Sequence, residues 1–111
     1  MNLSGYRGDT LVYNLNITKN GQSLNITGAD LIFTVRNYYG ETGNGLIQKT
    51  TSNTGIIITG PTTGGAQLII NTGDTYSLAS KGYVYDIQMN LSNVVSTVSR
   101  GNFDLYYDVT R

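Results

Sequence analysis

The sequence predicts an all-β protein, an antiparallel β-sandwich of about seven to nine short strands. Three observations support this prediction. Hydrophobic residues recur at every second position in several segments, which is typical of strands with one buried face. Fourteen glycines and abundant Asn and Thr supply turns between these segments. Helical periodicity is missing over any useful length, so the sheets have to pack on each other.

The first expected strands cover residues 10–17, 22–26 and 31–36. Between the first two, Asn20-Gly21 suits the positive φ angles of a type I′ turn. The hydrophobic residues expected to face inward alternate along these strands: Leu11, Tyr13, Leu15, Ile17, Leu24, Ile26, Leu31, Phe33 and Val35.

The middle of the chain is expected to begin with a loop over residues 37–45, which holds three glycines and shows no periodicity. A single helical turn is expected at Asp74–Leu78, with Asp74 capping its free amides. Three short strands are expected between them, at residues 46–50, 55–59 and 65–70.

The last third of the chain contains the two clearest strands, at residues 82–90 and 101–109. The segment between them is too short for a helical crossover, so we expect antiparallel neighbours. Their inward residues are expected to be Tyr83, Tyr85, Ile87, Met89, Phe103, Leu105, Tyr107 and Val109.

Tyr83 has two interpretations. Leu78 precedes it by a few residues, an arrangement that is like the tyrosine corner of immunoglobulin-type sandwiches, in which a Tyr hydroxyl ties a connection to the next strand. Alternatively, Tyr83 and Tyr85 are ordinary core residues of an amphipathic strand. Both interpretations assign these tyrosines to stability.

Composition limits the class of function. A chain of 111 residues forms one domain, residues 1–111, and is long enough for a core that is stable without a disulfide bond or a bound metal. Cysteine and histidine are absent, which removes thiolate metal sites and the commonest general base. A net charge of zero offers no cationic field for nucleic acid. We also expect no membrane span and no secretory signal.

Enzymatic or metal chemistry has few candidate residues. Glu41 is the sole glutamate, so a carboxylate site would have to use aspartates. Asp86, Asp104 and Asp108 could converge on a calcium ion, but solvated carboxylates on a strand face are much commoner. We therefore expect no catalytic residue, no metal and no cofactor.

Tyrosines are the more informative outliers, with nine in the chain and no tryptophan. Tyr6, Tyr38, Tyr39 and Tyr106 fall in loops, near the terminus or on an outward face, and Arg7 adjoins the first of them. Exposed Tyr and Arg are enriched at protein interfaces, so these five residues form the candidate interface. The alternative is that some of the tyrosines simply cover the open ends of the sandwich.

The order of the motifs resembles a known family. The motifs that carry the resemblance are Tyr6-Arg-Gly-Asp-Thr-Leu-Val-Tyr-Asn-Leu-Asn-Ile17, Asn20-Gly21, Leu24-Asn-Ile-Thr-Gly-Ala-Asp-Leu-Ile-Phe-Thr-Val-Arg36, Gly64-Gly-Ala-Gln-Leu-Ile-Ile70, Asp74-Thr75, Leu78, Gly82-Tyr-Val-Tyr-Asp-Ile87, Gly101-Asn-Phe-Asp-Leu105 and Asp108-Val-Thr110. Together they resemble the N-terminal domain of baseplate upper proteins from tailed bacteriophages. Each motif is ordinary strand-and-turn chemistry, and their order and spacing carry the resemblance over nearly the whole chain.

This resemblance implies an immunoglobulin-like β-sandwich that attaches to other virion proteins. In that family the domain docks on a tail hub, and a C-terminal extension carries the receptor-binding parts. This sequence ends at Arg111, directly after its last expected strand, so we expect a small structural subunit without such an arm.

The sequence therefore predicts a non-enzymatic virion protein: a baseplate, tail or fibre-anchoring adaptor, or a capsid decoration subunit. It would be made in the host cytoplasm, not secreted, and incorporated into the virion. Its partners would be other phage virion proteins, and it would form a symmetric homo-oligomer or occur in repeated copies. The alternative is a glycan-binding sandwich that contacts host polysaccharide through Tyr38, Tyr39 and neighbouring Asn residues.

Overall fold

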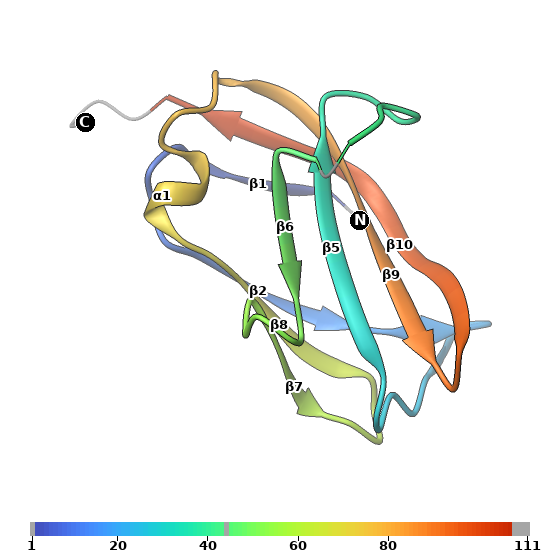
Figure 1. Cartoon of the computed structure of the whole chain (residues 1–111). Helices are drawn as coiled ribbons and strands as arrows, with labels where there is room; N and C mark the ends of the chain where they lie inside the picture. Colours follow the sequence, from blue (N-terminus) through green and yellow to red (C-terminus); the bar gives the residue numbers. More distant parts are fainter. Residues whose placement is uncertain (1, 44, 108–111) are drawn as a thin grey trace.

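The computed structural model describes residues 2–43 and 45–107, which form two facing sheets (Figure 1). The five-stranded sheet has the order β1-β10-β9-β5-β6, and the three-stranded sheet has the order β2-β8-β7. A separate ribbon, β3-β4, joins β2 to the segment before β5. The elements are β1 (Leu3–Tyr6), β2 (Leu11–Asn16), β3 (Thr18–Lys19), β4 (Gln22–Ser23), β5 (Asp30–Arg36), β6 (Ile47–Thr50), β7 (Ile56–Gly60), β8 (Gly65–Ile70), α1 (Thr72–Thr75), β9 (Lys81–Leu91) and β10 (Val94–Tyr106).

This arrangement confirms the predicted all-β, immunoglobulin-like sandwich. In immunoglobulin terms β2, β8 and β7 correspond to strands B, E and D, and β5, β9 and β10 to strands C, F and G. Two details differ from the prediction. The described residues contain ten strands, because the two-residue β3 and β4 add to eight sheet strands. One pair, β1 with β10, is parallel.

The core lies between the two sheets and consists largely of the residues expected to face inward. Phe33, Tyr85 and Leu105 belong to one buried cluster, in which the rings of Phe33 and Tyr85 lie 5.4 Å apart between centroids. The other buried members come from both sheets and their connections: Leu3, Leu15, Ile17, Ile26, Ala29, Leu31, Val35, Ile47, Ile56, Ala66, Leu68, Ile70, Tyr83, Ile87, Met89 and Phe103. The period-two pattern therefore predicted the buried faces of β5 and β9.

Tyr83 fulfils both interpretations of its role. Its ring is buried in the core with 4% exposure, and its hydroxyl donates a 2.7 Å hydrogen bond to the Ala79 carbonyl at the start of the connection into β9. Burial raises the pKa of this hydroxyl. A tyrosine-corner bond thus fixes the end of the sandwich next to α1.

The segment 91–100, expected to be only a connection, is mostly strand. β9 and β10 form one long hairpin of 11 and 13 residues, joined by Ser92 and Asn93 with φ angles of 53° and 65°. These angles fit a type I′ turn, and the β-branched residues that follow extend the hairpin beyond the expected strand ends. A β-bulge lies between Thr97 and Ser99.

At the other end of β10, Tyr107 was expected to face the core, and this was wrong. β10 ends at Tyr106, and Tyr107 is exposed. The physical reason is that the neighbouring strands have already ended, since Tyr106 pairs with the last residue of β1 and Leu105 with the first residue of β9. The predicted inward position of Val109 lies outside the described residues.

Two further boundaries differ from the prediction. The helical turn is Thr72–Thr75, two residues earlier than expected, and Asp74 caps it from inside: its carboxylate accepts a 2.7 Å hydrogen bond from the Asn71 N–H. The return strand after Asn20-Gly21 covers only β4. Beyond β4 the Ile26 N–H donates a hydrogen bond to the Pro61 carbonyl. At this point the chain therefore pairs with the turn between β7 and β8 and no longer with β3.

Candidate protein interface

The structure brings three of the five predicted interface residues together. Tyr6 and Tyr106 are register partners on β1 and β10, with ring centroids 6.1 Å apart. The Arg7 N–H donates a 2.8 Å hydrogen bond to the Tyr106 carbonyl. The Arg7 guanidinium carbon lies 4.9 Å from the ring centroid of Tyr107 and 5.8 Å from that of Tyr76. We call Tyr6, Arg7, Tyr76, Tyr106 and Tyr107 together the Tyr-Arg cluster.

The Tyr-Arg cluster is held in place by the fold. Tyr6, Tyr106 and Tyr107 lie at the ends of β1 and β10, and Tyr76 directly follows α1, at the same end of the sandwich (Figure 1). The turn after β1 is tied to α1 by a buried 2.9 Å hydrogen bond from the Gly8 N–H to the Thr75 hydroxyl. The backbone positions that carry the aromatic groups are therefore held relative to one another.

Each tyrosine of the cluster keeps between 50% and 60% of its surface exposed. Tyrosine buries a large area at low conformational cost, and its hydroxyl still finds a partner at a wet rim. The Arg7 guanidinium adds cation–π attraction to the rings of Tyr76 and Tyr107. This combination of residue types is typical of the energetically dominant part of protein interfaces.

Tyr38 and Tyr39 lie elsewhere, in the loop between β5 and β6. The Tyr39 hydroxyl donates a 2.9 Å hydrogen bond to the Gly101 carbonyl, and the Arg100 guanidinium lies 3.9 Å from its ring centroid. Tyr39 is thus packed against β10, whereas Tyr38 is 62% exposed. The predicted set of five residues divides into two separate places.

The same loop is stiffened by Glu41. Its two carboxylate oxygens accept hydrogen bonds of 3.0 Å from the backbone N–H and the side-chain amide of Asn37. These bonds lower the pKa of the Glu41 carboxyl, with the side-chain bond as the largest cause. The sole glutamate therefore has a structural role in shaping the loop that carries Tyr38 and Tyr39.

Sequence reasoning missed two members of the Tyr-Arg cluster, Tyr76 and Tyr107. Tyr76 was assigned to the helical turn, and Tyr107 to the core by alternation. Alternation gave no signal for Tyr107, because Tyr106 faces outward and a period of two then places Tyr107 inward. Nothing local marked Tyr76, whose place beside Arg7 depends on long-range packing.

The aspartates on the outward face do not converge. Asp86 on β9 pairs with Arg100. Asp104 on β10 pairs with Gly82, which lies four residues before Asp86 on β9. Four strand residues span about 13 Å, which is too far for two carboxylates to share one cation. Among the described residues no group of three or more acidic side chains could hold a metal ion. Asp108, the third residue of the calcium hypothesis, lies outside them.

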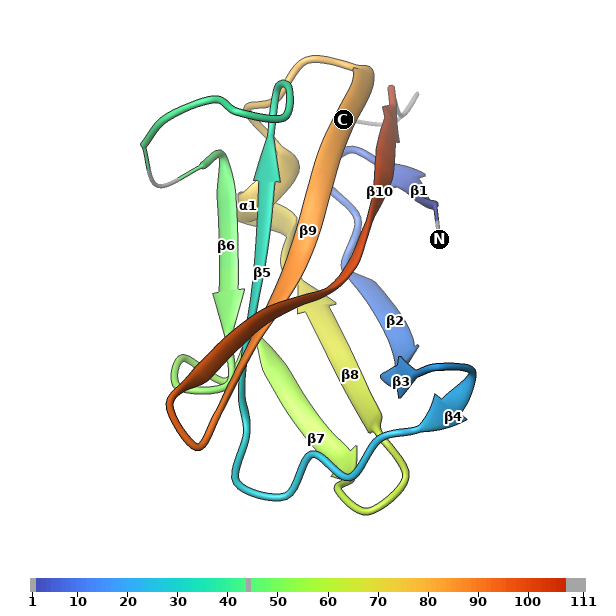
Figure 2. The same cartoon turned by 90° about the vertical axis from the view of Figure 1, so that its right-hand side faces the viewer.

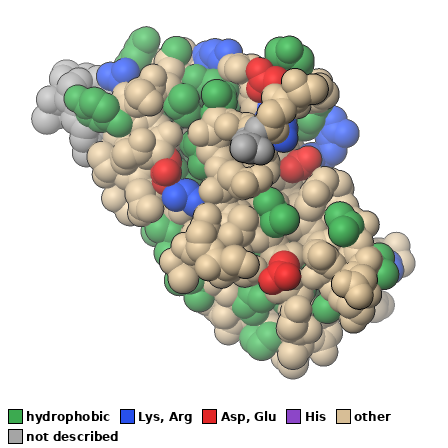
Figure 3. All heavy atoms as spheres, in the orientation of Figure 1, with side chains coloured by type: hydrophobic (Ala, Val, Ile, Leu, Met, Phe, Trp, Pro, Cys, Tyr) green, Lys and Arg blue, Asp and Glu red, His purple; other side chains and the backbone are tan. Residues whose placement is uncertain are grey.

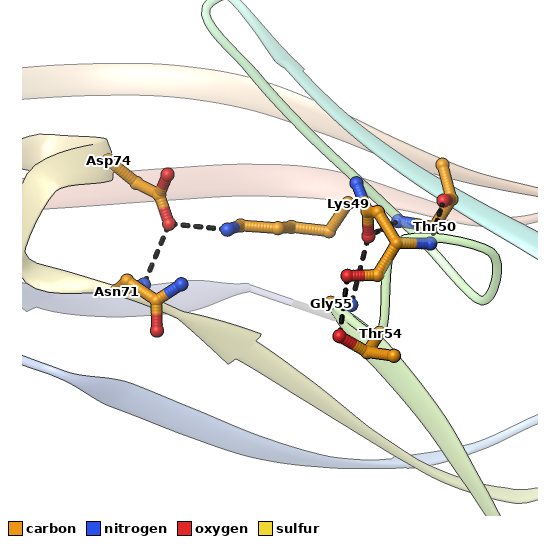
Figure 4. Close-up of polar contacts among 7 residues, drawn as sticks. Lys49, Thr50, Thr54, Gly55, Asn71 and Asp74 are labelled. Carbon is orange, nitrogen blue, oxygen red and sulfur yellow. Dashed lines mark hydrogen bonds and ion pairs between the residues drawn. The ribbon is translucent and has the colours of Figure 1, made fainter.

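Charge on the surface is sparse and mixed. On the face shown in Figure 3, acidic and basic side chains are scattered among polar and hydrophobic ones, some of them beside a charge of opposite sign, without a large patch of one sign. One ion pair is partly buried: the Lys49 ammonium on β6 lies 2.6 Å from the Asp74 carboxylate and links the five-stranded sheet to α1 (Figure 4). This ion pair is structural.

The fold and the Tyr-Arg cluster define the chain as an immunoglobulin-like β-sandwich with an exposed aromatic surface. No family model matches the chain, and no curated protein sequence does. In the part of the chain that the structure describes, no helix is long and apolar enough to cross a membrane.

Proposed function

We propose that this chain is a non-enzymatic structural protein of a bacteriophage virion, which binds other virion proteins through the Tyr-Arg cluster. The observation that carries the proposal is the cluster itself: four half-exposed tyrosines around Arg7, fixed by backbone pairing and by the bond to α1. Burying such preorganised aromatic groups against a partner gives affinity with little loss of side-chain entropy.

The assignment to a phage rests on the order of motifs that resembles the N-terminal domain of baseplate upper proteins. The chain would serve as a baseplate or tail adaptor, a fibre-anchoring subunit or a capsid decoration subunit. Repeated copies around a symmetry axis would multiply a modest affinity by avidity, which favours a symmetric oligomer or repeated sites in the particle.

Incorporation into purified particles tests the proposal. The chain should co-purify with the particles of the phage that encodes it, and Tyr107→Ala should lower its incorporation by about tenfold, as expected for an interface hot spot. Tyr107 lies outside β10, so this change spares the core. Tyr38→Ala is the matched control and should be incorporated normally. Absence of the chain from the particles would refute the proposal.

Glycan binding is the second candidate function, and the exposure of Tyr38 favours it. An exposed aromatic ring beside Asn37 offers a stacking surface and an amide for a sugar. Tyr39 contributes less than expected, because Arg100 covers one face of its ring. A glycan array with the wild-type chain and Tyr38→Ala tests this function, which requires retention of a polysaccharide that the variant loses.

A further inference from the structure

The distal half of the β9–β10 hairpin has an open side. β1 pairs only with Phe103–Tyr106, so Val94–Ser99 has β9 on one side and no described strand on the other. In Figure 2 this part of β10 crosses in front of β9 toward the hairpin tip, with no strand drawn before it. The backbone groups on an unpaired edge are a ready template for another strand.

A groove lies beside this edge. It has a volume of about 510 Å³ and separates the hairpin from β3 and the segment after β4. Its lining is mostly apolar, with Leu24, Met89, Leu91, Val94 and Val98 as the hydrophobic members. The edge therefore adjoins a concave surface that alternate side chains of an added strand could fill.

The edge also lacks the usual protection against pairing. Natural edges carry Lys, Pro or inward-pointing charges, whereas residues 92–99 contain neither proline nor any charged residue. Val94 and Val95 are 65% and 62% exposed. The bulge between Thr97 and Ser99 interrupts the edge but leaves Val94–Thr97 as a regular run.

We propose that this edge and groove accept an extended segment of a partner polypeptide, which adds as a strand beside Val94–Thr97 and inserts alternate apolar side chains into the groove. Lys19 is the one charged residue among those that line the groove, so the segment should carry an acidic residue that reaches it. This inference depends on the proposed function in one respect: it takes the partner segment to belong to another virion protein.

A second folded copy fits this surface less well than a flexible segment. Edge-to-edge pairing of two copies would involve only the four-residue run before the bulge, and a stable interface needs about 800 Å² on each partner. A flexible segment can pair with the same run and also bend into the groove, which adds apolar contact.

A peptide titration tests the proposal. The probe is the acetylated and amidated peptide Thr-Val-Glu-Val-Thr-Val-Thr, added to the isotope-labelled full chain and followed by amide NMR. Binding should shift the amides of Val94–Ser99 and Lys19. Val94→Lys should weaken binding by about tenfold, because it places a charge at the pairing edge. Val12→Lys is the matched control, since Val12 is equally accessible on the edge strand β2 but does not line the groove, and it should bind normally.

Charge reversal tests the chemistry of the segment. Lys19→Glu should weaken binding of the Glu peptide several-fold and strengthen binding of the same peptide with Lys in place of Glu. A dissociation constant weaker than about 1 mM, equal binding to Val94→Lys, or shifts centred on another edge would each overturn the proposal. So would dimerisation of the free chain that Val94→Lys abolishes, because the occupant would then be a second copy. The proposed function has a separate readout, since virion incorporation depends on the Tyr-Arg cluster.

Discussion

At the residue scale, tyrosines make the side-chain hydrogen bonds and form the exposed aromatic surface that distinguish this chain. The rings of Tyr83 and Tyr13 are at least partly buried. The Tyr83 hydroxyl donates a hydrogen bond to the Ala79 carbonyl, and the Tyr13 hydroxyl donates one to the Ser4 carbonyl, each 2.7 Å long. The second bond links β2 to β1, and therefore joins the two sheets. The exposed tyrosines form the candidate interface, so the same residue type contributes to the core and to the proposed binding surface.

Tyr83→Phe separates the hydroxyl of the tyrosine corner from its ring. Phenylalanine keeps the packing but leaves the Ala79 carbonyl without its donor, so we expect a loss of about 1 kcal/mol in the free energy of unfolding. Urea denaturation measures this loss. Tyr38→Phe is the control, because Tyr38 is exposed, and its midpoint should not move. Equal midpoints for the wild type and Tyr83→Phe would show that the corner bond contributes nothing.

Tyr13 gives a pH dependence. Burial raises the pKa of its hydroxyl from 10.0 to about 12. The unfolded chain therefore loses this proton at a lower pH than the folded chain. The contribution of the protonated Tyr13 hydroxyl to the free energy of unfolding is therefore fully present below pH 10 and is lost as the pH rises through about 12. The stability advantage of the wild type over Tyr13→Phe should shrink across this window, as measured by urea denaturation at each pH. A constant advantage would contradict the assignment.

At the element scale, the turn between β7 and β8 is fixed by a close backbone approach. Gly64 has a φ of 77°, and the Ile17 N–H donates a 2.8 Å hydrogen bond to its carbonyl. A Cβ added at Gly64 would meet the Ile17 carbonyl oxygen at 2.2 Å, a contact with backbone that cannot move aside. The type I′ turn at Gly21 has a similar φ of 78° but open space around it.

Alanine at these two glycines should therefore have unequal effects. Gly21→Ala should cost about 1 kcal/mol, the ordinary price of a left-handed conformation. Gly64→Ala should cost about 3 kcal/mol or more, because steric overlap adds to the same backbone strain. Thermal or urea unfolding of both variants measures the difference. Equal losses would mean that the close approach of Gly64 to Ile17 is relaxed in solution.

The ion pair between β6 and α1 should respond asymmetrically to its two deletions. The Lys49 side chain is 11% exposed and the Asp74 side chain 27%. Asp74→Ala leaves a buried ammonium without a partner and also removes the cap on Asn71, so we expect a loss of about 3 kcal/mol. Lys49→Met leaves a carboxylate that is still bonded and partly hydrated, with a loss of about 1 kcal/mol.

Urea denaturation of the two single variants and the double variant measures this asymmetry. The double variant should be more stable than Asp74→Ala alone, because it no longer buries an unpaired charge. The reverse order of the two single variants would contradict the structural role given to the pair.

Elements were predictable wherever one face of a strand is buried. The alternation in β2, β5 and β9 predicted their inward faces, because a one-residue slip would expose every core side chain. Sequence reasoning failed at strand ends. Val94–Arg100 extends β10 without a buried face to reveal it, and Tyr107 continues the alternation after its neighbouring strands have stopped. Strand length depends on partners, which a local pattern does not contain.

At the scale of the whole molecule, the sandwich separates two surfaces with different physics. The Tyr-Arg cluster at the α1 end offers preformed aromatic groups, and the hairpin edge offers unpaired backbone beside an apolar groove. Tyr6, Arg7 and Tyr106 were predictable from the sequence as candidate interface residues, but Tyr76 lies beside them only through the packing of α1 against the turn after β1. The location of the open hairpin edge depends on the strand order of the five-stranded sheet, which the sequence pattern does not contain.

Cryo-electron microscopy of purified phage particles tests the central claim most directly. We predict repeated copies of the sandwich in the particle, with the end that carries Tyr6, Arg7, Tyr76 and Tyr106 buried against a neighbouring virion protein. Particles without density for this sandwich, or with copies whose Tyr-Arg cluster faces solvent, would contradict the account.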